Sequence, residues 1–225
     1  MRWVLLHSPL TGPSIWRAVA AEAEARGHDT VVAELPALEG PSPYQRIGLH
    51  VAAQIGDGPA ILVAHSGAGA LADIVAAASA GAVEQIAHVD AILPHPGRSW
   101  ADTAADALLD RLRSDAVDAR APAWDRWFPE GALGSLIPEE GPREDFIGEL
   151  QPTPLSFLEA RAPDIAPAEP VAWTYLRLSR AYESQARAAR REGRPTLRRD
   201  LHHLSPLTHP KAVTSSLENL MRGAR

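Results

Sequence analysis

The segment spanning residues 60–80 constrains the fold more than any other part of the chain. The branched apolar residues Ile61, Leu62 and Val63 lead into Ala-His-Ser-Gly-Ala, and an alanine-rich stretch follows. This order is typical of a buried strand that turns sharply into a helix, with Ser66 at the turn. Such a turn aims the serine hydroxyl at the helix N-terminus, where free N–H groups can hold a developing negative charge. We therefore interpret Ser66 as either a nucleophile or an ordinary helix N-cap.

The residues on either side of this turn are small. Ala64 and Ala68 stand two positions before and two positions after Ser66. Small side chains there allow the strand and the helix to pass closely. The common form of the motif has glycine at both positions, so the pattern in this chain is a relaxed version of it.

Strands and helices alternate through the first third of the chain. The apolar periodicity predicts strands at residues 3–6, 29–33, 60–64 and 85–93, with helices at 13–26, 44–55 and 66–80. This alternation predicts right-handed βαβ units and a mostly parallel central sheet with helices on both faces, which is the α/β class. Towards the end of the chain we expect a strand at 171–178, a helix that ends near residue 193 and a last helix at 210–222.

Residues 95–169 break the alternation. A helix is expected at 100–113, and the Pro- and Trp-rich segment after it contains Trp124, Trp127 and Phe128 but no run typical of a strand. We expect a small cap-like insertion over the C-terminal edge of the sheet, where α/β sheets bind ligands. Its aromatic residues either line an apolar substrate pocket or form the core of the insertion itself.

Composition and charge narrow the classes of function. The 225 residues predict one domain, residues 1–225, with the 45% hydrophobic and 22% charged content of ordinary globular proteins. The net charge of −6 argues against a nucleic-acid partner, and the absence of cysteine excludes disulfides and thiolate metal sites. No apolar run reaches membrane length, and the first one is too short for a signal segment. We expect a cytoplasmic protein with no membrane partner, acting on a small molecule as a monomer or small homo-oligomer.

Four segments, in the correct order, resemble the α/β-hydrolase fold and, within it, the small esterase and hydroxynitrile-lyase-like branch. They are His-Ser-Pro-Leu-Thr-Gly-Pro-Ser-Ile-Trp at 7–16, the turn around Ser66, Val-Asp-Ala-Ile-Leu-Pro at 89–94 and His-Leu-Ser-Pro-Leu-Thr-His-Pro at 203–210. The resemblance covers nearly the whole chain. It implies the α/β-hydrolase fold and chemistry that needs no cofactor, and no histidine pair stands at the spacing of a metal site.

The resemblance also implies a nucleophile and a base. Ser66 would be the nucleophile and His203 its general base, because a serine hydroxyl attacks well only when a base accepts its proton. His202 is the immediate rival of His203. The distance in sequence to Pro210, which opens the last helix, favours His203.

The acid of such a triad is less regular here. Its usual place in the fold follows the strand at 171–178, where this chain has Ser-Arg-Ala-Tyr-Glu and no aspartate. Some members of the fold supply the acid one strand earlier, where this chain has Asp90. Asp90 is therefore either the triad acid or a structural residue that accepts backbone hydrogen bonds, and Glu183 is the fallback acid.

The oxyanion-binding groups depart from the family pattern. One donor is expected to be the N–H of Gly67, but the usual second donor falls on Pro9, which has no N–H. Either the N–H of Leu10 donates, or the side chain of Ser8 or Thr11 does, or the reaction needs no complete oxyanion hole. Our site prediction takes Gly67 and Leu10 as the oxyanion donors.

Five residues are expected to contact the substrate. They are His7, Pro9, Trp124, Trp127 and Phe128.

Three hypotheses cover the function of the chain. The leading hypothesis is a serine hydrolase that cleaves a small, largely apolar ester, thioester or lactone through an acyl-enzyme. The alternatives are a non-hydrolytic lyase or cyclase acting on a specialised metabolite, and a non-catalytic protein that binds a ligand in the same pocket.

Overall fold

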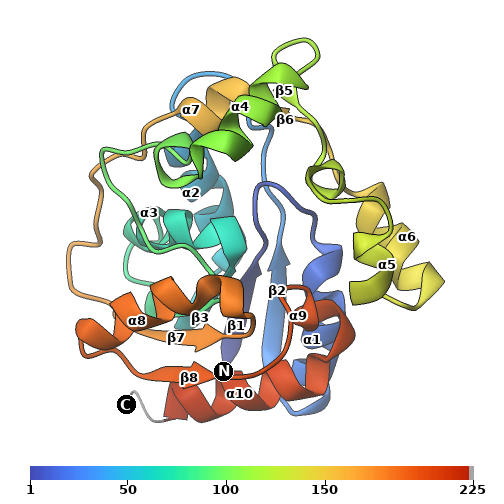
Figure 1. Cartoon of the computed structure of the whole chain (residues 1–225). Coiled ribbons are helices and arrows are strands. Elements are labelled where there is room, and N and C mark those ends of the chain that lie inside the picture. Colours follow the sequence, from blue (N-terminus) through green and yellow to red (C-terminus); the bar gives the residue numbers. More distant parts are fainter. Residues whose placement is uncertain (223–225) are drawn as a thin grey trace.

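A six-stranded sheet forms the centre of the molecule in the computed structural model, which describes residues 1–222 (Figure 1). In spatial order the strands are β2 (Asp29–Ala33), β1 (Arg2–Leu6), β3 (Ala60–His65), β4 (Val83–Val89), β7 (Ala172–Arg177) and β8 (Thr196–Arg198). Every neighbouring pair is parallel. The carboxyl ends of all six strands therefore meet at one edge, and the predicted α/β class is confirmed.

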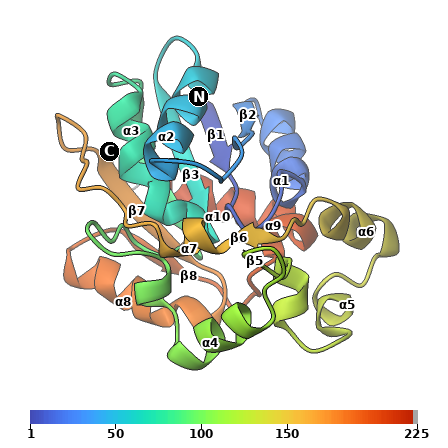
Figure 2. The same cartoon turned by 90° about the horizontal axis from the view of Figure 1, so that it is seen from above.

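Helices cover both faces of this sheet. They are α1 (Ser14–Ala25), α2 (Pro43–Ile55), α3 (Ala72–Ala78), α8 (Glu183–Arg191), α9 (Ser205–Thr208) and α10 (Pro210–Arg222). Figure 2 shows α2 and α3 on one side of β1 and α1 on the other. Successive side chains of a strand point to opposite faces. Val4 and Leu6 thus join the core beneath α2 and α3, whereas Trp3 and Leu5 join the core beneath α1 and α10.

The segment predicted to form an insertion contains four short helices and a small second sheet. The helices are α4 (Asp106–Ser114), α5 (Ala132–Leu136), α6 (Glu140–Gly148) and α7 (Leu155–Glu159), and the sheet pairs β5 (Arg120–Ala121) with β6 (Thr153–Pro154) in antiparallel fashion. In Figure 1, α4, α7, β5 and β6 lie above the end towards which the central strands point. The expectation that this segment has no strand was wrong, because two-residue pairings leave no periodic pattern to detect.

Three predicted elements have different limits in the structure. The predicted strand at 85–93 begins at Val83 and ends at Val89, because Asp90 leaves the extended conformation with a φ of 42°. The predicted helix at 66–80 begins with a tight 3₁₀ turn, η1 (Ser66–Leu71), before α3. The predicted helix at 100–113 is interrupted by extended residues between the 3₁₀ turn η2 (Ala101–Thr103) and α4.

Gly69 allows the turn after β3 to approach the turn after β4. A Cβ atom at Gly69 would lie 2.0 Å from the carbonyl oxygen of Ile92, closer than any real contact. The N–H of Ile92 in turn donates to the carbonyl oxygen of Ser66 at 3.1 Å. Because Gly69 has no side chain, the segments that carry Ser66 and Asp90 can lie close together. Over residues 1–222, no helix is both long enough and apolar enough to cross a membrane.

Candidate active site

Ser66 stands at the sharp turn between β3 and η1. Its φ of 58° is a left-handed conformation that a serine adopts only under local constraint, and its side chain is nearly buried. The hydroxyl contacts the side chains of His203 and Tyr182. Among the described residues, Ser66 Oγ accepts no hydrogen bond from the N–H groups of η1, so its contacts do not support the N-cap interpretation and instead place the hydroxyl beside His203.

A chain of two hydrogen bonds links Ser66, His203 and Asp90. Ser66 Oγ lies 3.0 Å from Nε2 of His203, and Nδ1 of His203 lies 3.1 Å from Oδ2 of Asp90. With Nδ1–H donating to the carboxylate, Nε2 is left to accept the serine proton. His202 points elsewhere, since its Nε2 contacts the hydroxyl of Thr208. The structure therefore brings together the three residues predicted to form the triad.

Asp90 is fully buried and bound on every side. Its Oδ1 accepts the N–H of Leu178 at 2.7 Å, and its Oδ2 accepts the hydroxyl of Ser179 at 2.6 Å in addition to His203. Burial by itself raises the pKa of a carboxyl group, but the hydrogen bonds from His203 and Ser179 outweigh it and hold the pKa of Asp90 below its ordinary value. Asp90 thus contacts His203 and also accepts backbone hydrogen bonds, the geometry that each of its two interpretations requires.

The fallback acid, Glu183, lies in a different environment. At the start of α8 its carboxylate forms ion pairs with Arg177, Arg187 and Arg198. The hydrogen bond from Arg198 contributes most to a lowered pKa of Glu183, and the hydrogen bond from Arg187 and the charge of Arg177 act in the same direction. A carboxylate held by three guanidinium groups is not oriented towards His203, so the structure does not support Glu183 as the acid.

Two aromatic rings stack on the imidazole of His203. The ring centroids of Tyr182 and His203 are 4.9 Å apart, and those of His65 and His203 are 4.5 Å apart. His65 is fully buried, its Nε2 donates to the carbonyl oxygen of His203, and burial lowers its pKa to about 3. His65 therefore stays neutral and holds the loop that carries His203.

The sequence analysis did not identify Tyr182 as a site residue. It lies in the 3₁₀ turn η4 (Arg180–Tyr182) after β7, and its hydroxyl is 3.3 Å from Ser66 Oγ. Burial raises the pKa of Tyr182 to about 12, so the phenol is protonated at neutral pH. The one signal for it in the sequence is its position just after a strand of the parallel sheet, at the edge where such sheets bind ligands.

The loop after β1 lies directly over Gly67. A Cβ atom at Gly67 would be 2.8 Å from Ser8 Oγ. The N–H of Leu10, predicted as an oxyanion donor, instead donates to Ser8 Oγ at 3.1 Å, and the hydroxyl of Thr11 donates to the carbonyl oxygen of Ser8. Because Ser8 Oγ accepts from Leu10, its own proton is free to be donated to a further acceptor beside Gly67.

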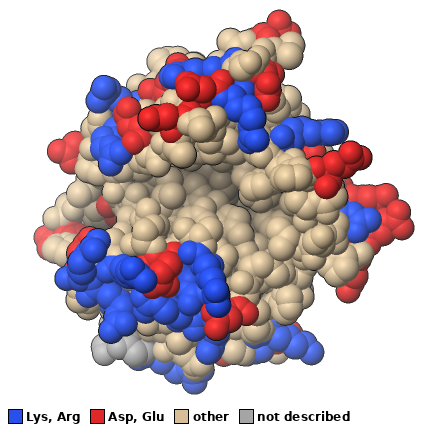
Figure 3. All heavy atoms as spheres, in the orientation of Figure 1, with Lys and Arg blue, Asp and Glu red and all other residues tan. Residues whose placement is uncertain are grey.

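A cavity of about 310 Å³ opens at the candidate triad. Its polar wall is formed by Ser66, Tyr182 and His203, and the remaining lining residues are apolar or aromatic. Trp124, Trp127 and Phe128 line it as predicted, and Trp127 also belongs to the buried core. Figure 3 shows a hollow surrounded by uncharged atoms on this face, and the arginine-rich surface lies to one side of it over α8.

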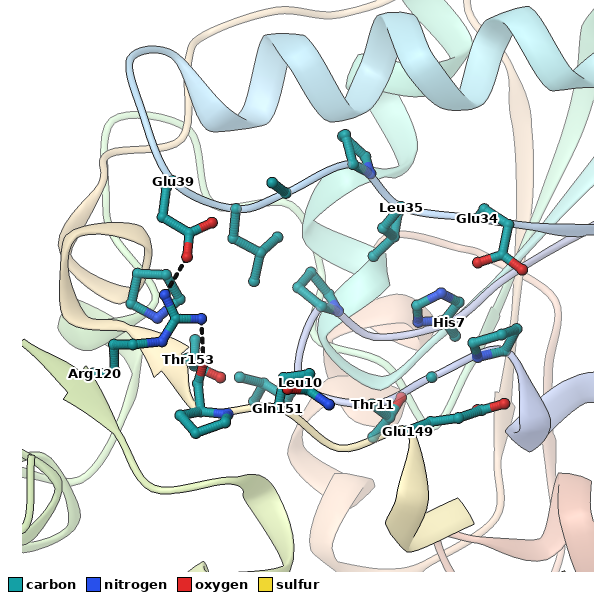
Figure 4. Close-up of a pocket in the computed structure, with 18 residues that line it drawn as sticks. His7, Leu10, Thr11, Glu34, Leu35, Glu39, Arg120, Glu149, Gln151 and Thr153 are labelled. Atoms are coloured by element: carbon teal, nitrogen blue, oxygen red, sulfur yellow. Dashed lines mark hydrogen bonds and ion pairs between the residues drawn. The ribbon is translucent and has the colours of Figure 1, made fainter. Parts of the chain in front are cut away.

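His7 does not line this cavity. It borders a separate cavity of about 290 Å³ on the other side of the β1–α1 loop, together with Glu34, Glu149 and the ion pair of Arg120 with Glu39 (Figure 4). His7 Nδ1–H donates to the carbonyl oxygen of Ser8 at 2.8 Å, and burial lowers its pKa. His7 is therefore not placed in the cavity that contains Ser66, and its ring braces the loop through the hydrogen bond to Ser8.

Pro9 borders both this separate cavity and a small cavity next to Gly67. It does not line the cavity that contains Ser66, but it borders the small cavity beside Gly67. Among the described residues, no group of three or more histidine, aspartate and glutamate side chains is arranged to hold a metal ion.

The sequence matches no protein-family model and no curated protein, whereas solved structures resemble the whole chain. An extracellular α/β-hydrolase from a Paenibacillus species, described as sharing structural and functional homology with tobacco salicylic acid binding protein 2, has a TM-score of 0.77 and 18% identity over 98% of both chains. Tomato methylketone synthase I complexed with 2-tridecanone has a TM-score of 0.73 and 13% identity over 100% of this chain and 98% of that one. Polyneuridine aldehyde esterase has a TM-score of 0.71 and 16% identity over 98% of both.

These likenesses span the sheet, the helices on both faces and the segment over the strand ends. Together with the parallel sheet and the turn at Ser66, they show that the chain has the α/β-hydrolase fold. At identities of 13–18%, they describe architecture and not chemistry.

Proposed function

We propose that this protein is a serine hydrolase that cleaves a small, largely apolar ester, thioester or lactone. The observation that carries the proposal is the continuous chain from Ser66 Oγ through His203 to Asp90, with distances of 3.0 and 3.1 Å. Ser66 would attack the carbonyl carbon while His203 accepts its proton, and Asp90 would stabilise the imidazolium that forms. The hydrolase and esterase names among the structural neighbours support the same chemistry.

The second half of the reaction uses the same groups. His203 returns its proton to the leaving group, which departs and leaves an acyl group on Ser66. A water molecule then attacks this ester while His203 again serves as base, and the acid product leaves with Ser66 restored. The three residues thus act twice, and their geometry meets the hydrogen-bond distances that both proton transfers need.

The developing oxyanion would be held by the N–H of Gly67 and the hydroxyl of Ser8. Pro9 supplies no N–H, and the N–H of Leu10 is used to orient Ser8 Oγ at 3.1 Å. A hydroxyl whose lone pair is occupied by a backbone N–H has its proton left for the oxyanion. This arrangement replaces the missing backbone donor with a side chain.

Tyr182 would assist at the hydroxyl oxygen of Ser66. Its hydroxyl, 3.3 Å from Ser66 Oγ, can donate to that atom because the serine proton points to His203. The phenol stays protonated, since burial raises its pKa to about 12. We infer that it steadies Ser66 before attack and can then donate to the leaving oxygen.

A non-hydrolytic lyase or cyclase is the second candidate. The observation that favours it is the oxyanion loop, in which one backbone donor is missing at Pro9 and the next, at Leu10, is already engaged with Ser8. Such an enzyme would use the Ser66 and His203 pair for proton transfer without an acyl-enzyme. Tomato methylketone synthase I shares the fold, so its name illustrates that the architecture is not tied to one reaction.

The first experiment is labelling with a fluorophosphonate, located by intact mass and peptide mapping. We expect stoichiometric modification of Ser66, abolished in His203→Ala and Ser66→Ala. A screen of p-nitrophenyl acetate, thioesters and lactones then measures turnover. Folded protein that is neither labelled nor active on any of these esters would contradict hydrolysis. Proton-transfer catalysis without labelling would support the lyase or cyclase, and ligand binding without turnover would support a non-catalytic receptor.

A further inference from the structure

Two cavities of very different size meet at Gly67. The large one, about 310 Å³, contains Ser66 and His203, and the small one is about 20 Å³. We call them the large lobe and the small lobe. They share four wall residues, which are Leu10, Gly67, Ile92 and Trp100. A substrate whose reacting carbonyl lies at Ser66 therefore has a roomy space on one side and a narrow one beside Gly67.

The position of His203 decides which half of an ester occupies which lobe. His203 and Tyr182 line the large lobe, whereas Ser8 lines the small one. The leaving oxygen must lie within reach of Nε2 of His203, because that atom returns the proton to it. The alcohol part of the ester is thus directed into the large lobe. The carbonyl oxygen then faces Gly67 and Ser8, and the acyl chain occupies the small lobe.

The size of the small lobe limits the acyl chain. A water molecule needs about 10–15 Å³ of volume in this measure. A lobe of about 20 Å³ holds a group close to a methyl in size, and a longer chain would collide with its walls. These walls are firm, because Leu71, Leu158 and Phe157 are buried in the core and Phe157 stacks on Tyr44 with centroids 5.8 Å apart.

The large lobe has the opposite character. Its walls come mostly from the segment over the strand ends, including Leu108, Trp124, Trp127 and Leu136, and they carry no charge among the described residues. Phe128 also lines the large lobe and is 42% exposed, so it lies at the rim. An apolar, uncharged group of considerable size is the complement of such a surface.

We propose, building on the hydrolase function above, that the substrate is an acetate or similarly short acyl ester of a bulky, uncharged, apolar alcohol. The bond from Ser66 Oγ to the acetyl carbon forms as the bond from that carbon to the alcohol oxygen breaks. The serine proton passes through His203 to the alcohol oxygen, and the neutral alcohol leaves. Water then cleaves the acetyl-serine, with its proton returning to Ser66 Oγ, and acetic acid is released.

Two isomeric esters test this assignment. Benzyl acetate and methyl phenylacetate contain the same atoms, but the bulky and the small group exchange sides of the ester bond. We expect kcat/KM for benzyl acetate to exceed that for methyl phenylacetate by at least about 10-fold, the discrimination typical of a misfit in an apolar pocket. Equal or reversed values would overturn the assignment of the lobes while leaving the hydrolase function standing.

Absence of Ser66-dependent turnover has a different meaning. If neither ester nor p-nitrophenyl acetate is hydrolysed by the wild type above the level of Ser66→Ala, the hydrolase function fails and the substrate class fails with it. Comparison with Ser66→Ala thus distinguishes failure of the lobe assignment from failure of the hydrolase function, and no further variant is needed.

A matched pair of variants assigns the lobes directly. Phe157→Leu enlarges the small lobe, and Phe128→Leu makes the same chemical change at the rim of the large lobe. With p-nitrophenyl esters, we expect Phe157→Leu to raise the butyrate-to-acetate ratio of kcat/KM by at least about 10-fold. Phe128→Leu should leave this ratio within about twofold. An equal response of both variants, each shown to be folded by circular dichroism, would overturn the proposal.

Discussion

The phenol ring of Tyr182 lies parallel to the imidazole of His203, with ring centroids 4.9 Å apart and an interplanar angle of 6°. His65 also stacks on His203, with its Nε2–H bound to the backbone of the same residue. A ring enclosed in this way can rotate little about its side-chain bonds. Its two nitrogens therefore stay directed at Ser66 and Asp90, a preorganisation that enzymes need for efficient proton transfer.

Replacing Tyr182 by phenylalanine removes the hydroxyl and keeps the stacked ring. We expect kcat for p-nitrophenyl acetate to fall by about 3- to 10-fold, the effect of one lost hydrogen bond of about 0.5–1.5 kcal/mol. Tyr182→Ala should lower kcat further because it also frees the imidazole. If the phenylalanine variant matches the wild type and only the alanine variant is slow, the ring alone matters and the hydroxyl has no role at Ser66.

Asp90→Asn tests the triad acid. The asparagine amide would favour the wrong tautomer of His203, so we expect kcat to fall by about 10³- to 10⁴-fold with the fold retained. Steady-state kinetics give the rate, and thermal unfolding checks stability. Glu183→Gln is the control, and its kcat should stay within about twofold of the wild type because its carboxylate lies among arginines. An unchanged kcat in Asp90→Asn together with a large loss in Glu183→Gln would assign the role of triad acid to Glu183.

Ser8→Ala tests the side-chain oxyanion donor. We expect kcat to fall by about 10²- to 10³-fold, as when one oxyanion donor is removed from a hydrolase. Pro9→Ala restores a backbone N–H at the usual position and serves as the comparison. With Ser8 present it should change kcat by less than about threefold. A full rate in Ser8→Ala, or a large gain in Pro9→Ala, would show that Ser8 is not the donor.

Gly69→Ala tests the close approach that joins the turns of Ser66 and Asp90. The new methyl group would lie 2.0 Å from the carbonyl oxygen of Ile92, so the backbone must shift. We expect the free energy of unfolding to fall by about 2–3 kcal/mol. Gly134→Ala in α5, where a Cβ meets no atom within 4 Å, is the matched control and should be neutral or slightly stabilising. Urea denaturation measures both.

Two buried histidines predict that the protein loses stability in mild acid. Burial lowers the pKa of His88 to about 4 and that of His65 to about 3. The unfolded chain binds protons at these sites near pH 6.5 and the folded chain does not, so stability is complete above that pH and falls as pH decreases towards 4. Each site contributes a loss of about 1.2 kcal/mol between pH 7.0 and 5.5.

His88→Phe should remove one of these contributions. The difference in unfolding free energy between pH 7.0 and 5.5 would then shrink by about 1 kcal/mol, whatever the effect on stability at pH 7.0 alone. His50→Gln on the exposed side of α2 is the control and should leave the difference unchanged. A wild type whose denaturation midpoint does not move between these pH values would contradict the buried, neutral state of both histidines.

Local pattern in the amino-acid sequence was sufficient to predict the main elements of the fold. The apolar runs, the turn at Ser66 and the Pro-opened last helix predicted a parallel α/β sheet. These features are local because strand, turn and helix formation depend on neighbouring residues. The resemblance of the segments at 89–94 and 203–210 to the α/β-hydrolase fold implied the roles of Asp90 and His203.

Alternatives that depend on contacts between residues distant in sequence required the three-dimensional arrangement. Asp90 meets His203 because β4 lies beside β7 and the loop before α9 closes over both, whereas Glu183 is drawn away by three arginines. Likewise, Tyr182 reaches Ser66 across 116 positions of sequence, and His7 lines a different cavity. Such contacts arise when helices and strands pack into one core, and the periodicity of a single segment contains no information about its partners.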